Sequence, residues 1–304
     1  MRDGPSPEAE QVIAVLRSHR GADDHDTRSF EQRRGDLDAL ASRWPLPAGV
    51  ATEVVDEAGV RGLWLAPEAA DADRCLLYLH GGGYTRGSTT SHGELAARLA
   101  VAAGTCALVV EYRLAPEHPF PAALDDATAA FDLVVGDRGI APARTAIAGD
   151  SAGGGLTVAT LLRRRDGGRP APGGALLLSP WLDLRVADVA GRPTAALDPM
   201  LSPGDLRRSA AAYLAGHPDD DPLVSPIVAD LSDLPPMLVL VGTEELLLQD
   251  ATGFARRASA AGSDVRLVEG PGLFHVWPIF PGLPESASAV ADAGAFLREV
   301  TGGT

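Results

Sequence analysis

The chain has 304 residues, 45% of them hydrophobic, so it can bury one sizeable core and needs no second catalytic domain. Its 41 acidic and 26 basic residues give a formal net charge of −15, which argues against nucleic acid or an anionic membrane as a partner. The sequence contains no lysine, which excludes Schiff-base chemistry and a serine–lysine dyad.

Two helical patterns precede the first predicted strand, at about residues 7–20 and 27–44. Residues 1–10 are charged and contain proline, unlike a signal peptide, and no apolar run reaches the roughly 18 residues of a membrane span. We therefore expect a cytoplasmic protein that does not bind membranes.

Short apolar runs then alternate with mostly helical stretches, which is typical of an α/β fold with a largely parallel sheet. The predicted strands are residues 60–65, 75–79, 106–112, 145–148, 175–179, 237–241 and 264–268. Cys75 and Cys106 fall within two of these strands. We expect buried free thiols there, and not a disulfide or a metal-binding pair.

A triple-glycine stretch, His80-Gly81-Gly82-Gly83, comes directly after the strand at 75–79. It should lie at the carboxyl end of that strand, which is the usual ligand side of an open α/β sheet. Acyl transfer to a serine passes through a tetrahedral oxyanion, which must be met by backbone N–H donors, and glycine permits their close approach. We therefore predict oxyanion donors at Gly81, Gly82 and Gly83.

The stretch Gly149-Asp150-Ser151-Ala152-Gly153 has the form Gly-x-Ser-x-Gly. The strand at 145–148 precedes it and a helical pattern at 156–164 follows it, which is the context of a nucleophile elbow. Small flanking residues let the chain turn sharply, so that the Ser151 hydroxyl projects from the turn. We interpret Ser151 as the nucleophile, and the N–H of Ala152 as a further oxyanion donor.

Carboxylates that could serve as the acid of a triad follow the strand at 237–241. On an elbow of this kind the partners follow the nucleophile in the order serine, acid, histidine. Glu244 and Glu245 come just after the strand, and Asp250 lies a little further on. Because neighbouring residues of an extended chain point in opposite directions, at most one of the adjacent pair should reach the histidine. The pattern leaves these candidates open.

Only two of the seven histidines follow Ser151 in the chain, His217 and His275. His217 lies in a polar, aspartate-rich loop, where a solvated side chain is expected. His275 follows the strand at 264–268 and a glycine- and proline-containing loop, so it lies beyond the end of a strand. We predict His275 as the general base.

Several stretches together are typical of one family. They are His80-Gly81-Gly82-Gly83-Tyr84, Tyr112-Arg113-Leu114-Ala115-Pro116-Glu117, Gly149-Asp150-Ser151-Ala152-Gly153-Gly154, Ser179-Pro180-Trp181-Leu182-Asp183 and Gly272-Leu273-Phe274-His275-Val276-Trp277. On these the chain resembles the hormone-sensitive-lipase-like esterases, also called bacterial esterase family IV, of the α/β-hydrolase fold. The resemblance covers nearly the whole chain after about residue 60.

The resemblance also selects among the carboxylates. Many members carry an Asp-Pro-Leu-x-Asp stretch whose first aspartate is the triad acid, and this chain departs from that pattern. Residues 245–250 look like the branch in which glutamate takes that place, with Leu247 at the matching leucine. The alignment implies Glu245 as the acid, ahead of Glu244 and Asp250.

By the same resemblance, residues 1–50 and an insertion at about 185–224, with a helix at 206–214, would form a helical cap over the active site. Residues 51–304 would form the catalytic α/β-hydrolase domain. Tyr84 and Trp277 would line the acyl pocket. The family implies no metal and no organic cofactor, and it is compatible with a homodimer.

The expected function is therefore a serine carboxylic ester hydrolase that forms an acyl-enzyme with short to medium acyl esters. Lactone hydrolysis is an alternative, because residues 274–278 resemble branches that include lactone hydrolases. An acyltransferase or cyclase could use the same acyl-serine. A non-catalytic binding protein is less favoured, because a binding protein on this scaffold lacks the triad histidine and this chain has His275.

Overall fold

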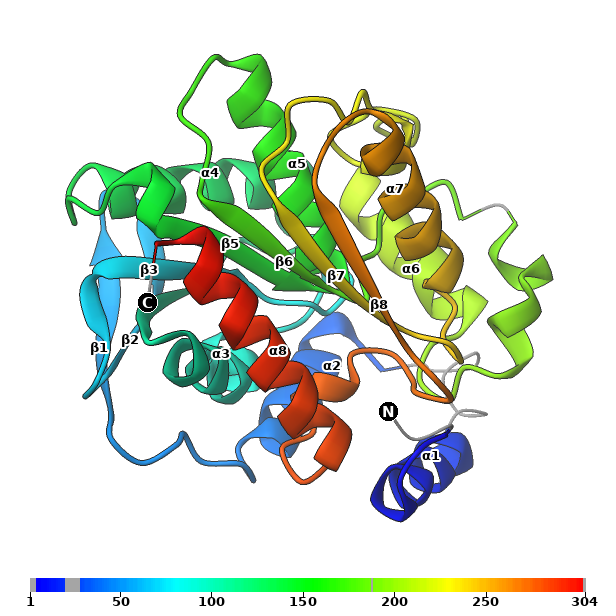
Figure 1. Cartoon of the computed structure of the whole chain (residues 1–304). Coiled ribbons are helices and arrows are strands. Elements are labelled where there is room, and N and C mark those ends of the chain that lie inside the picture. The colour runs from blue at the N-terminus through cyan, green and yellow to red at the C-terminus, as the bar shows by residue number, and fades with distance from the viewer. Residues whose placement is uncertain (1–3, 20–27, 187, 303–304) are drawn as a thin grey trace.

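The computed structural model describes residues 4–19, 28–186 and 188–302, and its centre is an eight-stranded sheet (Figure 1). The strands lie in the order β1-β2-β4-β3-β5-β6-β7-β8. Strands β3 to β8 run parallel, whereas β2 is antiparallel to both of its neighbours. Their bounds are β1 Val50–Glu57, β2 Val60–Pro67, β3 Asp71–Leu79, β4 Thr105–Val110, β5 Thr145–Asp150, β6 Gly174–Leu178, β7 Met237–Gly242 and β8 Val265–Gly270. The prediction of a mostly parallel α/β fold is confirmed.

All of the predicted strands are present, and β1 is the one that the sequence reading missed. It is an edge strand in which Val55 is the only buried residue. Its outward positions include Glu53, Asp56 and Glu57. Charged side chains on both faces protect an edge from pairing with another chain, and they also remove the apolar pattern by which a strand is recognised.

Helices cover both faces of the sheet (Figure 1). The helices are α1 Pro7–His19, α2 Phe30–Ala41, α3 Thr89–Ala103, α4 Ala122–Val135, α5 Ala152–Asp166, α6 Pro203–Leu214, α7 Leu248–Ala260 and α8 Pro284–Val300. Consecutive residues of the central strands point to opposite faces of the sheet and pack in two separate hydrophobic cores. Leu77 packs in the core with α4, α5 and α7, whereas Leu76 and Tyr78 pack in the core with α3 and α8.

The two segments expected to form a cap lie at the carboxyl ends of the parallel strands. Arg34 of α2 donates to the carbonyl of Thr85 at 2.8 Å, and Arg33 forms a buried ion pair with Asp205 of α6. Arg17 of α1 pairs with Glu244, beyond β7, at 3.0 Å. The predicted helix ends at residues 20 and 27 lie outside the described residues.

Helix α6 begins three residues earlier than the predicted 206–214. The side chain of Ser202 accepts a hydrogen bond from the N–H of Asp205, and Pro203 occupies the first helical position. Both cysteines are free and buried, as predicted. Among the described residues, no helix is long and apolar enough to cross a membrane.

Candidate active site

Ser151 lies between the end of β5 and the start of α5, in the strand–turn–helix context of an elbow. Its backbone has φ 52° and ψ −120°, a strained conformation for a residue with a side chain. Gly153 lets the start of α5 approach the end of the neighbouring strand β3, because a Cβ there would be 1.9 Å from the carbonyl oxygen of Leu79. The local sequence therefore holds Ser151 in a strained turn at the carboxyl edge of the sheet.

The glycine loop approaches the elbow, but its N–H groups are not equivalent. The N–H of Gly81 donates to Asp150 Oδ1 at 3.0 Å, so it is not directed at a bound substrate. In the part of the chain that the structure describes, no hydrogen bond occupies the N–H groups of Gly82, Gly83 or Ala152. The prediction of an oxyanion donor at Gly81 is therefore corrected, because that N–H anchors the loop to the elbow.

The carboxylate of Asp150 anchors the glycine loop to the elbow. Its carboxylate accepts from the Tyr78 hydroxyl at 2.8 Å and lies 3.3 Å from His92 Nε2. Burial is the largest influence on the pKa of Asp150 and acts to raise it, but His92, Tyr78 and His80 together bring this pKa below its usual value. Asp150 is therefore an ionised anchor for the oxyanion loop.

The two adjacent glutamates point in different directions, as predicted, although both lie in the turn after β7 and not in the strand itself. Glu245 is fully buried, and its Oε1 lies 3.4 Å from Nδ1 of His275, which is also buried. The other oxygen, Oε2, accepts from the N–H of Gly242 at 3.1 Å. Glu244 instead reaches outward to Arg17. Only Glu245 of this pair is placed to orient the histidine.

The remaining candidates lie elsewhere. Asp250 pairs with Arg192 at 2.7 Å and accepts from the N–H of Leu182 at 3.3 Å. Burial raises the pKa of Asp250 to about 7. His217 pairs with Asp221 of its own loop at 2.8 Å.

Residues 76–279 match the model of a family described as alpha/beta hydrolase fold. An esterase of the bacterial hormone-sensitive lipase family, of known crystal structure, is 39% identical and superposes with a TM-score of 0.91 over 97% of this chain and 99% of its own. The chain belongs to the hormone-sensitive-lipase-like esterases of the alpha/beta hydrolase fold.

Further members of the family are also similar to this chain. The acetyl-hydrolase of Streptomyces hygroscopicus is 46% identical over 240 residues, which is 79% of this chain and 80% of the relative. The esterase of Acinetobacter venetianus is 35% identical over 273 residues, or 87% of each chain. The crystal structure of EstE5 has a TM-score of 0.91 at 36% identity, over 98% of this chain and 99% of its own. As a member of this esterase family, the chain is a carboxylesterase-type serine hydrolase.

Ser179 is a site residue that sequence reasoning quoted only as part of a motif. It directly follows β6, and its hydroxyl donates to Glu245 Oε2 at 2.7 Å and accepts from the N–H of Val276 at 3.0 Å. The preceding Leu178 accepts from the N–H of Ser151 at 2.9 Å. Ser179 therefore ties the loop of the acid to the loop of the base, beside the elbow. The feature of the sequence that could have identified Ser179 is its position directly after a predicted strand.

Tyr84 and Trp277, the two residues predicted to line the acyl pocket, lie on different sides of the sheet. Tyr84 stacks on Tyr213 of α6 with a ring separation of 3.8 Å, in the core that contains α5. Trp277 belongs to the opposite core. The left-handed backbone of Val276, with φ 49°, turns the chain away immediately after His275.

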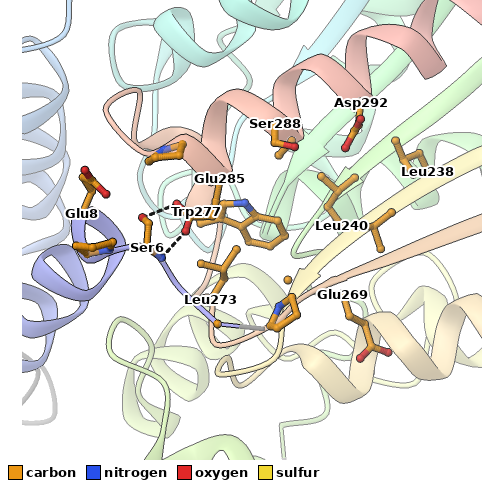
Figure 2. Close-up of a pocket in the computed structure, with 17 residues that line it drawn as sticks. Ser6, Glu8, Leu238, Leu240, Glu269, Leu273, Trp277, Glu285, Ser288 and Asp292 are labelled. Carbon is orange, nitrogen blue, oxygen red and sulfur yellow. Dashed lines mark hydrogen bonds between the residues drawn. The ribbon is translucent and has the colours of Figure 1, made fainter. Parts of the chain in front are cut away.

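Trp277 lines a cavity of about 510 Å³ together with Leu238, Leu240, Leu273 and residues of α8 (Figure 2). Neither Ser151 nor His275 lines this cavity. The predicted role of Trp277 in the acyl pocket is therefore corrected to packing on the α8 side of the sheet.

The environment of His275 predicts a pH dependence. Burial is the largest influence on the pKa of His275 and acts to lower it, but the hydrogen bond and charge of Glu245, with the charges of Asp198 and Asp150, raise this pKa above 6.5. Only neutral imidazole accepts a proton, so kcat/KM should rise with pH through an apparent pKa above 6.5. A pH–rate profile with chemistry limiting measures this. A profile that is flat between about pH 5 and 8 would remove His275 as the base.

Proposed function

We propose that the chain hydrolyses carboxylic esters with short to medium acyl groups through an acyl-enzyme on Ser151. The observation that carries the proposal is the buried contact of Glu245 with His275. Ser179 bonds to Glu245 and to the residue after His275, and it directly follows Leu178, which accepts from the N–H of the strained Ser151. The N–H groups of Gly82, Gly83 and Ala152 support it, because they are available to an oxyanion.

In this mechanism the Ser151 hydroxyl attacks the ester carbonyl and His275 takes its proton. The tetrahedral oxyanion accepts hydrogen bonds from the available N–H groups of the glycine loop and of Ala152. His275 then protonates the leaving alcohol. In the second half of the reaction a water molecule gives a proton to His275 and attacks the acyl carbon, and His275 returns that proton to the Ser151 oxygen as the acid is released. Glu245 keeps the proton on Nδ1 and stabilises the imidazolium.

The acyl preference rests on the relatives and on the cap. Two relatives, from Streptomyces hygroscopicus and Mycobacterium tuberculosis, are named acetyl-hydrolases, the second as putative. Tyr84 directly follows the glycine loop and stacks on Tyr213 of α6, and we propose that this buried pair closes the acyl pocket to long chains. We assign substrate selection to the cap, formed by the N-terminal segment and the insertion at 185–224. We place the enzyme in the cytoplasm, where two buried free thiols stay reduced.

A hydrolysis screen tests this function. We expect kcat/KM to be highest for acetyl to hexanoyl p-nitrophenyl esters and to fall by roughly tenfold or more for palmitoyl esters. Simple lactones in the same screen test the alternative substrate class, and an added alcohol tests acyl transfer. Faster turnover of lactones than of every ester, or an ester product that outweighs the free acid, would contradict the proposal.

A further inference from the structure

A second buried carboxylate, Asp198, holds the turn that carries the acid. It lies between a short 3-10 helix, Pro193–Ala196, and α6, in the inserted segment, and its exposed fraction is 0%. Its Oδ1 accepts from the N–H groups of Met200 and Leu201, both at 2.8 Å. Its Oδ2 accepts from the N–H of Leu246 at 2.7 Å. Leu246 is the residue directly after Glu245.

The carbonyl oxygen of Leu246 is also bound by the inserted segment. Arg192 of the inserted segment donates to the carbonyl oxygen of Leu246 at 2.7 Å, and it also pairs with the buried Asp250. Both polar groups of Leu246 are thus bound by one segment that lies some 50 residues earlier in the chain. These contacts matter because Glu245 lies in a turn between β7 and α7 and not in a regular element. The separation of 3.4 Å from His275 leaves little margin for displacement.

Asp198 also acts on the histidine through its charge. Asp198 is one of the groups whose charge raises the pKa of His275, after Glu245 itself. Burial is the largest influence on the pKa of Asp198 and raises it, whereas the charge of His275 and the N–H groups of Met200, Leu201 and Leu246 act to lower it. In its ionised form, Asp198 stabilises the imidazolium that forms during acyl transfer.

We propose that Asp198 is a positioning residue of the esterase, which fixes Glu245 against His275 through the N–H of Leu246 and adds a negative charge behind the imidazolium. The inference rests on the proposed function. It assigns to the inserted segment a part in catalysis separate from substrate selection. Arg192 also helps to position Glu245, through its hydrogen bond to the carbonyl oxygen of Leu246.

The test is Asp198→Asn. Asparagine keeps one oxygen for Met200 and Leu201, but its NH₂ group then faces the N–H of Leu246, where no hydrogen bond can form. We expect kcat to fall by about 100-fold with little change in KM, since a displaced catalytic group costs this much. The acid limb of kcat/KM should move to lower pH, because loss of a negative charge lowers the pKa of His275.

Asp230→Asn is the control. Asp230 lies outside the inserted segment and accepts from a backbone N–H, that of Ser232, at 3.0 Å, and no contact within the described residues joins its side chain to Leu246. We expect its kcat and acid limb to match those of the wild type. If Asp198→Asn unfolds at assay temperature, Arg192→Gln replaces it. We expect kcat to fall by about tenfold with little change in KM and no shift of the acid limb to lower pH, because the substitution removes no negative charge.

A double-mutant cycle with Glu245→Gln separates positioning from general damage. If Asp198 acts through Glu245, Asp198→Asn should cost less than about threefold in the Glu245→Gln background. An equal loss in both backgrounds, or a loss carried by KM with an unmoved acid limb, would overturn the proposal. If Glu245→Gln alone leaves kcat unchanged, the assignment of the triad is wrong. If Glu245→Gln is strongly impaired but Asp198→Asn costs as much in that background as in the wild type, only the proposal for Asp198 is wrong.

Discussion

Ser151→Ala is expected to lower kcat for ester hydrolysis by about six orders of magnitude, because no other group can form the acyl-enzyme. The fold should survive, since alanine removes only a hydroxyl and Ser151 is held by its backbone contacts to Leu178 and Trp181. Hydrolysis of a p-nitrophenyl ester and circular dichroism of the same preparation measure both effects. Ser286→Ala is the control, because Ser286 is also buried but lies in α8, where its hydroxyl donates to the carbonyl oxygen of Pro278. Substantial turnover by Ser151→Ala would exclude Ser151 as the nucleophile.

Glu245→Gln is expected to lower kcat by up to about four orders of magnitude. Glutamine has a similar volume, but it lacks the charge that stabilises the imidazolium and that holds the proton on Nδ1. The Ser179 hydroxyl would still find a partner at residue 245, so the protein should fold. Stopped assays of kcat, with thermal unfolding as the check on folding, measure the effect.

Glu244→Gln is the matched control at the neighbouring position. Its ion pair with Arg17 is partly exposed, and exposed pairs contribute little to stability. We expect kcat and the unfolding temperature to stay close to those of the wild type. A crippling Glu244→Gln with a nearly silent Glu245→Gln would reverse the assignment of the acid.

Much of the fold could be predicted because a parallel sheet is buried on both faces. Strands such as β4, β6 and β7 are apolar along almost their whole length in such a sheet, and they stand out in the sequence. Position after a strand end then identified candidates for the site, since ligand groups gather at the carboxyl edge. The edge strand β1 was not predicted, because its exposed side chains carry no apolar pattern.

The details of the site could not be predicted, because they depend on contacts between distant segments. The three glycines at 81–83 are alike in sequence, and only the approach of Asp150 occupies the N–H of Gly81. The direction of Trp277 depends on the left-handed backbone of Val276, a residue type that disfavours it. Asp198 lies in an irregular segment, where no periodicity marks a buried carboxylate.

Covalent labelling tests the central claim most directly. The esterase is treated with diethyl p-nitrophenyl phosphate, an analogue of the tetrahedral intermediate, and its peptides are analysed by mass spectrometry while activity is followed. We predict a diethylphosphoryl adduct on Ser151 whose extent matches the loss of activity, and no adduct in Ser151→Ala. An adduct on another serine that accounts for the inactivation, or full activity with Ser151 modified, would contradict the account.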